Sequence, residues 1–298
     1  MTIVPPEPGE PRRPHGPRDP GDAWVVAGTG ERYWGRFGAA GLLALDPERG
    51  VLLQHRVAWS HFGDTWGLPG GARHRGESAR DGALRESSEE AGVPPRAVRA
   101  RLISVFDADV WTYSTVVADV SEPFEPVISD PESRELAWVP VDAVADYPLH
   151  PGFAASWARL RALLAVRPAI VVDAANVVGS VPDGWWRDRA GAAARLLGAV
   201  ARLAERGLDA AALGLDADTW FPEVSVVVEG QARAVAEVDG IRLVRADGHG
   251  DDAIVAEAER LVSAARAVTV VTSDRGLAGR ADAAGAGVRP VSWLRDRL

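Results

Sequence analysis

The sequence changes its pattern near residue 167, and this change limits the possible folds more than any other feature. After it, short uninterrupted runs of apolar, mostly β-branched residues alternate with stretches of helical spacing. Such runs are typical of strands buried on both faces, as in parallel sheets covered by helices. We therefore expect residues 168–298 to form one parallel α/β domain with helices on both faces. The apolar runs are Ala169–Val172, Val224–Val228, Ile241–Val244 and Val268–Thr272, and the helical stretches are Trp186–Gly207 and Asp251–Arg266.

Before residue 167 the pattern is that of a mixed sheet with two helices. Two apolar runs separated by Asp-Pro-Glu-Arg-Gly predict a β-hairpin, and later segments predict further strands and a helix. We expect residues 23–166 to form one α/β domain. The hairpin strands are Ala39–Leu45 and Val51–Arg56, the further strands fall in Arg101–Val120 and Arg134–Val144, and the helix is Gly152–Val166.

The composition excludes several classes of protein. The 298-residue chain has no cysteine and therefore no thiolate metal site, and all 33 of its cationic residues are arginine, which excludes lysine nucleophiles and P-loops. A net charge of −9 argues against nonspecific coating of nucleic acid. No run approaches the ~20 apolar residues of a membrane span. The proline-rich residues 1–22 lack a signal-peptide core, so we expect a disordered tail on a cytoplasmic protein with no membrane partner. Nothing in the sequence indicates an oligomeric state.

An acidic cluster lies within the stretch Gly67–Val93. Pro69-Gly70-Gly71 predicts a sharp turn, and residues 78–90 predict a helix that ends at Gly92. On that helix Glu86, Glu89 and Glu90 lie at i, i+3 and i+4, so their carboxylates crowd one face, where like charges repel by roughly 0.2–0.5 kcal/mol per pair. Oxygen-only clusters of this kind suit Mg²⁺ or Mn²⁺.

The same stretch resembles the Nudix box. Gly71, Glu77, Arg85-Glu86, Glu89-Glu90 and Gly92 stand at its fixed spacing, and the resemblance covers about residues 23–165. It implies an α/β/α sandwich that hydrolyses nucleoside diphosphate-linked compounds with Mg²⁺ or Mn²⁺. Two residues depart from the pattern: Ser87 stands at a usually apolar position, and Gly82 stands in mid-helix, where glycine costs about 1 kcal/mol relative to alanine. The alternative interpretation is a salt-bridged surface helix.

The resemblance also implies roles for individual residues. Three glutamates are expected to bind metal, and one of them, or Glu135 of a later strand, is expected to accept a proton from water. Arg85 is expected to orient the cluster with support from Glu77, next to the substrate-binding turn. The expected metal ligands are Glu86, Glu89 and Glu90, the catalytic set adds Arg85 and Glu135, and the substrate-binding set is Gly70, Gly71 and Glu77.

A second acidic set falls at the ends of strands in the C-terminal half. In parallel α/β sheets, ligands bind beyond the carboxyl ends of the strands. We expect carboxylates gathered there to bind Mg²⁺ or Mn²⁺, and Asn176 to add an oxygen ligand or to orient a phosphate. The carboxylates are those of Asp173, Asp251, Asp252 and Asp274. The alternative is that these aspartates only cap turns and helices.

The surrounding segments resemble the NYN branch of PIN-type nucleases over residues 168–298. They are VVDAANVVG, GDDAIV and VTVVTSDRG. The resemblance implies metal-dependent cleavage of RNA, with Asp173, Asp251 or Asp252, and Asp274 at the metal site. It leaves the role of Glu229 open.

These observations lead to one principal expectation and two alternatives. The principal one is a metal-dependent pyrophosphohydrolase acting on a nucleoside triphosphate or related nucleotide, joined to an RNA-cleaving domain. The first alternative is an RNA 5′-end pyrophosphohydrolase coupled to a ribonuclease. The second is a nucleotide sensor that regulates RNA processing without turnover.

Overall fold

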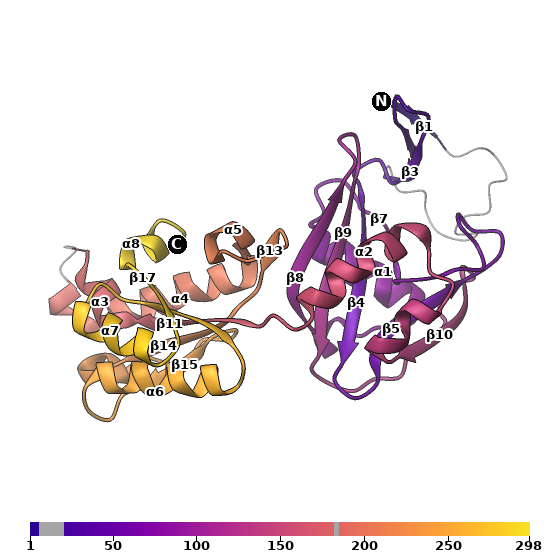
Figure 1. Ribbon diagram of the computed structural model, residues 1–298. Coiled ribbons are helices and arrows are strands. Elements are labelled where there is room, and N and C mark those ends of the chain that lie inside the picture. The colour runs from indigo at the N-terminus through magenta and orange to yellow at the C-terminus, as the bar shows by residue number, and fades with distance from the viewer. Residues whose placement is uncertain (6–20, 182–184) are drawn as a thin grey trace. The chain divides into compact units, whose positions relative to one another are not determined.

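The computed structural model describes residues 1–5, 21–181 and 185–298, and the chain forms two compact units (Figure 1). The first consists of Met1–Leu163 and Asp216–Thr219, and the second of Leu164–Leu215 and Trp220–Leu298. No helix of the described residues is long and apolar enough to cross a membrane.

The N-terminus of the first unit differs from the expected disordered tail. Thr2–Val4 forms strand β1, which pairs with β2 (Trp24–Val26), and β2 pairs in turn with β3 (Arg32–Trp34). The tail prediction is therefore wrong for β1, because its consecutive β-branched residues find an antiparallel partner. Residues 6–20 of the expected tail lie outside the described residues.

The main sheet of the first unit is mixed, as the sequence predicted. Its strand order is β10-β5-β4-β9-β8. The predicted hairpin is confirmed: β4 and β5 are antiparallel and pair Leu45 with Val51, whereas β4 and β9 are parallel. The strands are β4 (Ala39–Asp46), β5 (Gly50–Arg56), β8 (Val98–Asp107), β9 (Thr112–Val120) and β10 (Ser133–Val139).

Two short strands separate the far ends of β4 and β5. These long strands pair with each other at only two positions, and beyond them β5 pairs with β6 (Trp66–Gly67) while β4 pairs with β7 (Gly70–Ala72). The segment between β6 and β7 therefore crosses from one strand to the other and brings Gly70 and Gly71 against β4.

Helices cover both faces of this sheet. Helix α1 (Ala79–Ala91) packs its buried Ala83 against alternate residues of β4, including Leu42, and α2 (Pro151–Leu163) lies on the other face (Figure 1). The predicted helix is confirmed to within one residue. The backbone N–H of Asp81 donates to the Oγ of the N-cap Ser78, and Gly92 ends the helix at φ 62°, a left-handed conformation that favours glycine. Short 3₁₀ segments are η1 (Pro95–Ala97) and η2 (Val141–Asp146).

The second unit is built on a parallel sheet, as predicted. Its strand order is β15-β14-β11-β16-β17, and every neighbouring pair is parallel. The chain adds β14 on one side of β11 and later returns to add β16 on the other side. Strand order therefore reverses at β11. The strands are β11 (Pro168–Asp173), β14 (Glu223–Val228), β15 (Arg242–Arg245), β16 (Ala267–Val271) and β17 (Gly287–Arg289).

Helices cover both faces of the parallel sheet. Ile170 and Val172 pack into a core with α3, α4 and α8, whereas Ala169 and Val171 pack into a second core with α6 and α7. This alternation along β11 explains why the strand is apolar at every position from Pro168 to Val172. The helices are α3 (Ala174–Gly179), α4 (Arg189–Arg206), α5 (Ala210–Leu213), α6 (Gly250–Ser263), α7 (Arg275–Ala283) and α8 (Val291–Arg295); the remaining short elements are η3 (Trp185–Arg187), η4 (Gly230–Ala234), β12 (Leu208–Asp209) and β13 (Thr219–Trp220).

Candidate functional site

The glycine turn of the first unit lies directly against α1. A Cβ atom added to Gly71 would lie 2.8 Å from the carboxylate carbon of Glu86, and one added to Gly70 would lie 2.4 Å from the carbonyl oxygen of Ala40. Only glycine therefore allows this backbone to pass between β4 and the helix.

Arg85 connects the glutamates of the predicted site. Its Nε and Nη2 donate to the two carboxylate oxygens of Glu77 at 2.8 and 2.9 Å, and its Nη1 donates to Glu86 at 2.6 Å and to Glu89 at 3.4 Å. Burial raises the pKa of Glu77, but the hydrogen bonds from Arg85 and from the His74 N–H outweigh burial and lower it overall. The predicted orienting role of Arg85 corresponds to this fork of hydrogen bonds.

Glu90 is the most perturbed carboxyl group of the site. It is 5% exposed, and its Oε2 accepts hydrogen bonds from the Gly70 N–H at 2.9 Å and from Gln54 Nε2 at 3.3 Å. Burial and the nearby charge of Glu86 raise the pKa of Glu90 to about 8, although Arg56 and the Gly70 N–H act in the opposite direction. Glu86 is also buried, so two carboxylates lie close together in an environment shielded from water.

Glu89 and Glu135 are placed differently from this buried pair. The side chain of Glu89 is 43% exposed at the edge of the cluster. Glu135 is exposed and pairs with His55 across β10 and β5, so it lies on the face of β5 opposite to Gln54, which contacts Glu90. The structure therefore does not bring Glu135 together with Glu86 and Glu90, because side chains along a strand alternate between its two faces.

The two departures from the Nudix box have physical explanations. A Cβ atom on Gly82 would lie 3.0 Å from Glu77 Oε2 and 3.2 Å from Arg73 Cγ, so the glycine leaves room for the glutamate that holds Arg85. Ser87 is fully buried, and its hydroxyl donates to the carbonyl oxygen of Leu84 at 3.1 Å, which satisfies the polar group inside the helix.

Three residues near the buried pair were not predicted from the sequence, namely Gln54, Arg56 and Glu132. Gln54 hydrogen-bonds to Glu90, and the charges of Arg56 and Glu132 act on its pKa. Burial raises the pKa of Tyr113 to about 12, and the charges of Glu90 and Glu86 add to that rise. The available signal was the pair Gln54 and Arg56, which face the same side of the polar end, Gln54–Arg56, of a strand that is apolar before it.

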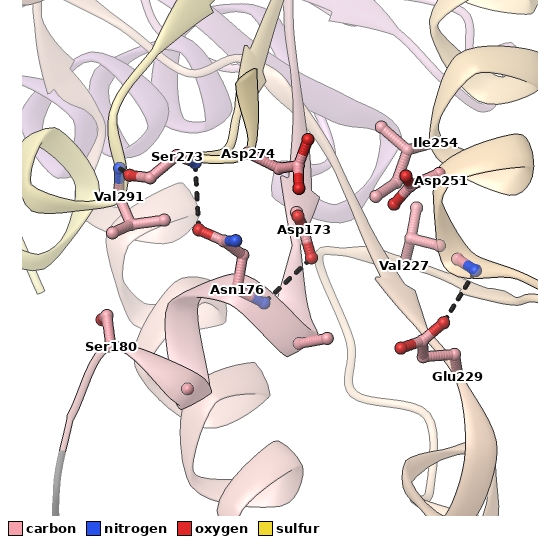
Figure 2. Close-up of a pocket in the computed structure, with 13 residues that line it drawn as sticks. Asp173, Asn176, Ser180, Val227, Glu229, Asp251, Ile254, Ser273, Asp274 and Val291 are labelled. Carbon is pink, nitrogen blue, oxygen red and sulfur yellow. Dashed lines mark hydrogen bonds between the residues drawn. The ribbon is translucent and has the colours of Figure 1, made fainter. Parts of the chain in front are cut away.

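The second unit has a cavity of about 480 Å³ at the carboxyl edge of its sheet, and acidic residues from four segments line it (Figure 2). They are Asp173 at the end of β11, Glu229 after β14, Asp251 at the start of α6 and Asp274 after β16. The cavity therefore lies where strand order reverses, the usual place for a ligand in a doubly wound sheet.

Hydrogen bonds within the chain hold Asp173 and its neighbours in place. Asp173 accepts from the Asn176 N–H at 3.0 Å and from the Thr272 hydroxyl at 2.9 Å, and Asn176 Oδ1 accepts from the Ser273 N–H at 2.9 Å. Burial, with smaller contributions from Asp251 and Glu229, raises the pKa of Asp173 despite those hydrogen bonds. Asp274 caps α7 by accepting from the Leu277 N–H. Both aspartates therefore also have the capping role of the alternative interpretation.

The cavity distinguishes between the two aspartates of the sequence Gly-Asp-Asp. Asp251 lines it, whereas Asp252 is exposed and pairs with Arg280 at 2.6 Å. Glu229, whose role the sequence left open, accepts from the Gly250 N–H at 2.7 Å and also lines the cavity (Figure 2).

The donor sets of both sites suit a divalent cation chemically, since they consist of carboxylate and amide oxygens. In the conformation observed, no group of three or more histidine, aspartate or glutamate side chains among residues 1–5, 21–181 and 185–298 is close enough to form a metal-binding cluster. In the first site, Arg85 holds Glu86, and Glu89 lies at the edge. Side-chain rotation would be needed to bring three carboxylates onto one ion.

Comparison with known proteins places the first unit in a family. Residues 35–160 match the NUDIX domain family. A protein of Mycobacterium tuberculosis named putative 8-oxo-dGTP diphosphatase 3 is 52% identical over 167 residues, which cover 52% of this chain and 76% of that protein. A Bifidobacterium longum protein named nucleoside triphosphate pyrophosphatase/Nudix hydrolase fusion protein is 42% identical over 153 residues, 49% of this chain and 32% of that protein.

Among solved structures, the Nudix hydrolase RenU of M. smegmatis is 50% identical and covers 49% of this chain and 96% of its own, with a TM-score of 0.46. The chain belongs to the Nudix family. The matched family region ends at residue 160, before the second unit begins.

Proposed function

We propose that the first unit hydrolyses a phosphoanhydride bond in a nucleoside diphosphate-linked substrate, with Mg²⁺ or Mn²⁺ held by Glu86, Glu89 and Glu90. The observation that carries this proposal is the buried carboxylate pair, Glu86 and Glu90, set against the backbone of Gly70 and Gly71. A bound divalent cation would supply the positive charge that favours ionisation of both carboxylates, polarise phosphate oxygens and lower the pKa of a water molecule.

The chain's own residues position the reacting groups. Arg85, itself fixed by Glu77, orients Glu86 through a 2.6 Å hydrogen bond. Within the buried pair, Glu90 is the candidate proton acceptor, and the Gly70 N–H holds its carboxylate by a 2.9 Å hydrogen bond. We favour Glu90 over Glu135 for that role, because Glu135 lies on the opposite face of the strand pair.

Nucleoside triphosphates are the substrate class that we propose first. The M. tuberculosis relative carries a name that refers to an oxidised deoxyguanosine triphosphate, and its similarity to this chain is high. The loop after β5 also exposes Trp59 and Phe62, whose rings offer surfaces for stacking a base.

A substrate screen of the full-length protein tests this proposal. The panel contains ordinary and oxidised deoxynucleoside triphosphates, dinucleoside polyphosphates and nucleotide sugars, each with Mg²⁺ and with Mn²⁺. We expect metal-dependent hydrolysis that is lost in the variant Glu89→Gln/Glu90→Gln and retained in Glu122→Gln, a control at an exposed glutamate. If the wild type binds nucleotides but hydrolyses no member of the panel, the sensor alternative replaces this proposal.

For the second unit we propose metal-dependent cleavage of RNA at the cavity lined by Asp173, Asp251 and Asp274. Its support is the convergence of four acidic residues at the point where strand order reverses. Two RNA substrates, one with a 5′-triphosphate and one with a 5′-monophosphate, also test the coupled alternative. Cleavage of both at equal rates would show that the two units act independently, and cleavage of neither would overturn the nuclease proposal.

A further inference from the structure

Helix α6 begins at the cavity of the second unit, and a residue far away in the sequence caps it. In the described part of the chain, the side chain of the N-cap residue His249 makes no capping hydrogen bond. The N–H of Gly250, one of the first N–H groups of the helix, instead donates to Glu229 Oε2 at 2.7 Å (Figure 2). The acceptor therefore comes from the residue after β14, 21 positions earlier.

The absence of a side chain at residue 250 makes this contact possible. Gly250 is buried, and a Cβ atom added to it would lie 2.7 Å from Glu229 Oε2 and 3.2 Å from the carboxylate carbon. Any larger residue would therefore displace the carboxylate. Gly248, two residues earlier, is different, since a Cβ atom there would meet nothing within 4 Å.

The same hydrogen bond ties Asp251 to the edge of the sheet. Strand β14 pairs with β11 so that Val227 lies opposite Asp173, and Glu229 follows two residues after Val227. Asp251 directly follows Gly250, and Asp251, Asp173 and Glu229 all line the cavity. The position of Asp251 relative to Asp173 therefore depends on the bond between Glu229 and Gly250.

Glu229 differs from an ordinary helix cap in its charge. Serine, threonine and asparagine cap helices without charge, whereas Glu229 adds a fourth carboxylate to a cavity that Asp173, Asp251 and Asp274 already line. Carboxylates placed together repel, and a bound divalent cation relieves that repulsion.

We propose that Glu229 is a positioning residue of the second cavity: it holds the Gly250 N–H and thereby fixes the carboxylate of Asp251 for binding a divalent cation. This inference rests on the proposed metal-dependent cleavage of RNA and adds a residue to that site. Glu229 acts through Asp251, so its effect on cation binding depends on the presence of the Asp251 carboxylate.

Two neutral variants of Glu229 test the proposal by calorimetry with Mn²⁺. Glu229→Gln keeps an oxygen that can accept the Gly250 N–H, whereas Glu229→Met is of similar length, equally neutral and without such an oxygen. We expect Glu229→Met to raise the Kd for Mn²⁺ at least about fivefold relative to Glu229→Gln, as for one lost hydrogen bond. When Asp251→Asn is added, the two variants should bind Mn²⁺ equally weakly.

The measurements use the full-length protein with Glu89→Gln/Glu90→Gln as the reference, because this change removes two proposed metal ligands of the first unit. Asp173→Asn in the same protein identifies the Mn²⁺ binding that belongs to the cavity. Thermal melting confirms that each variant is folded.

A second variant keeps every charge of the cavity. Gly250→Ala places a Cβ atom 2.7 Å from Glu229 Oε2, and Gly248→Ala is the matched control in the same loop. We expect Gly250→Ala to raise the Kd for Mn²⁺ at least about fivefold and Gly248→Ala to change it less than about twofold.

The outcomes separate this inference from the nuclease proposal. Equal Kd values for Glu229→Gln and Glu229→Met would overturn the inference, and so would a difference that persists when Asp251→Asn is present. If the expected pattern of Kd values is found but the wild type cleaves no RNA, the inference stands and the nuclease proposal is overturned. If the cavity of the reference protein binds no Mn²⁺, both are overturned.

Discussion

The carboxylates of the first site lie on one turn of a single helix, whereas those of the second cavity come from four separate segments. In the first site, Arg85 lies among the glutamates and balances part of their charge. In the second, N–H groups and the Thr272 hydroxyl hold the aspartates, with no arginine bonded to Asp173 among the described residues. A site on one helix is set by spacing in the sequence, but a site assembled at a sheet edge depends on strand order.

The largest expected effect is a loss of nucleotide hydrolysis that occurs on substitution of Glu90, in the buried pair of the first site, and not on substitution of Glu135. We expect Glu90→Gln to lower kcat for nucleotide hydrolysis by about 10²–10⁴-fold, because it removes both a metal ligand and the favoured proton acceptor. Glu135→Gln should retain most activity, since that side chain lies on the other face of β5 and β10. Steady-state kinetics with Mg²⁺ measure both. Loss of activity only in Glu135→Gln would reverse the assignment.

A second prediction asks whether the cavity of the C-terminal unit is an active site at all. We expect Asp173→Asn to reduce metal-dependent RNA cleavage by about 10²-fold, because it removes one of the negative charges that would attract the divalent cation to the cavity. Hydrolysis of nucleotides by the first unit should not change. A gel assay with end-labelled RNA measures the first effect. Equal cleavage by wild type and variant would show that Asp173 caps α3 and takes no part in RNA cleavage.

Both sites should make the folded protein less stable as the pH rises. Burial raises the pKa of both Glu90 and Asp173, that of Glu90 to about 8. Between pH ~4.5 and 8 the folded protein keeps the Glu90 proton while the unfolded chain loses it, so unfolding becomes easier as pH rises, by on the order of a few kcal/mol. Urea denaturation in EDTA should show this decline, and Glu90→Gln should reduce it. A stability that rises over this range would contradict the assignment.

A smaller effect is expected from one added methyl group. Gly71→Ala places a Cβ 2.8 Å from the Glu86 carboxylate carbon, so Glu86 must move, and we expect kcat to fall about 10–100-fold. The control is Gly28→Ala, whose Cβ would meet no atom within 4 Å. Kinetics and thermal melting of both variants test this. Full activity in a folded Gly71→Ala protein would show that the position of Glu86 tolerates adjustment.

The smallest effect is expected from a substitution of Asp252, which does not line the cavity. Its pair with Arg280 is exposed, so Asp252→Asn should change the free energy of unfolding by less than about 1 kcal/mol and leave RNA cleavage unaffected. Denaturation and the gel assay measure the two quantities. If Asp252→Asn lost as much cleavage as Asp173→Asn, Asp252 would have to be counted among the residues of the site.

Several elements could be predicted because their signals are local. The helix bounded by Ser78 and Gly92 follows from capping residues a few positions apart, and the parallel sheet follows from runs that are apolar at every position. Strand β1 could not be predicted, because its partner β2 begins 20 residues after β1 ends and pairing depends on that distant segment. Arg56 and Gln54 escaped prediction for the same reason: their significance comes from Glu90, more than 30 residues away.

The sequence by itself determined that three glutamates share one face of a helix and that strands buried on both sides make up the second half. Helical periodicity and apolar runs act over neighbouring residues, so they do not require knowledge of the rest of the chain. Tertiary structure alone decided that Glu135 faces away from Glu90, that Asp251 rather than Asp252 lines the cavity, and that Glu229 joins it. Strand register and the packing of helix on sheet set these directions, and a shift of one residue in strand register would turn a side chain to the opposite face of the sheet.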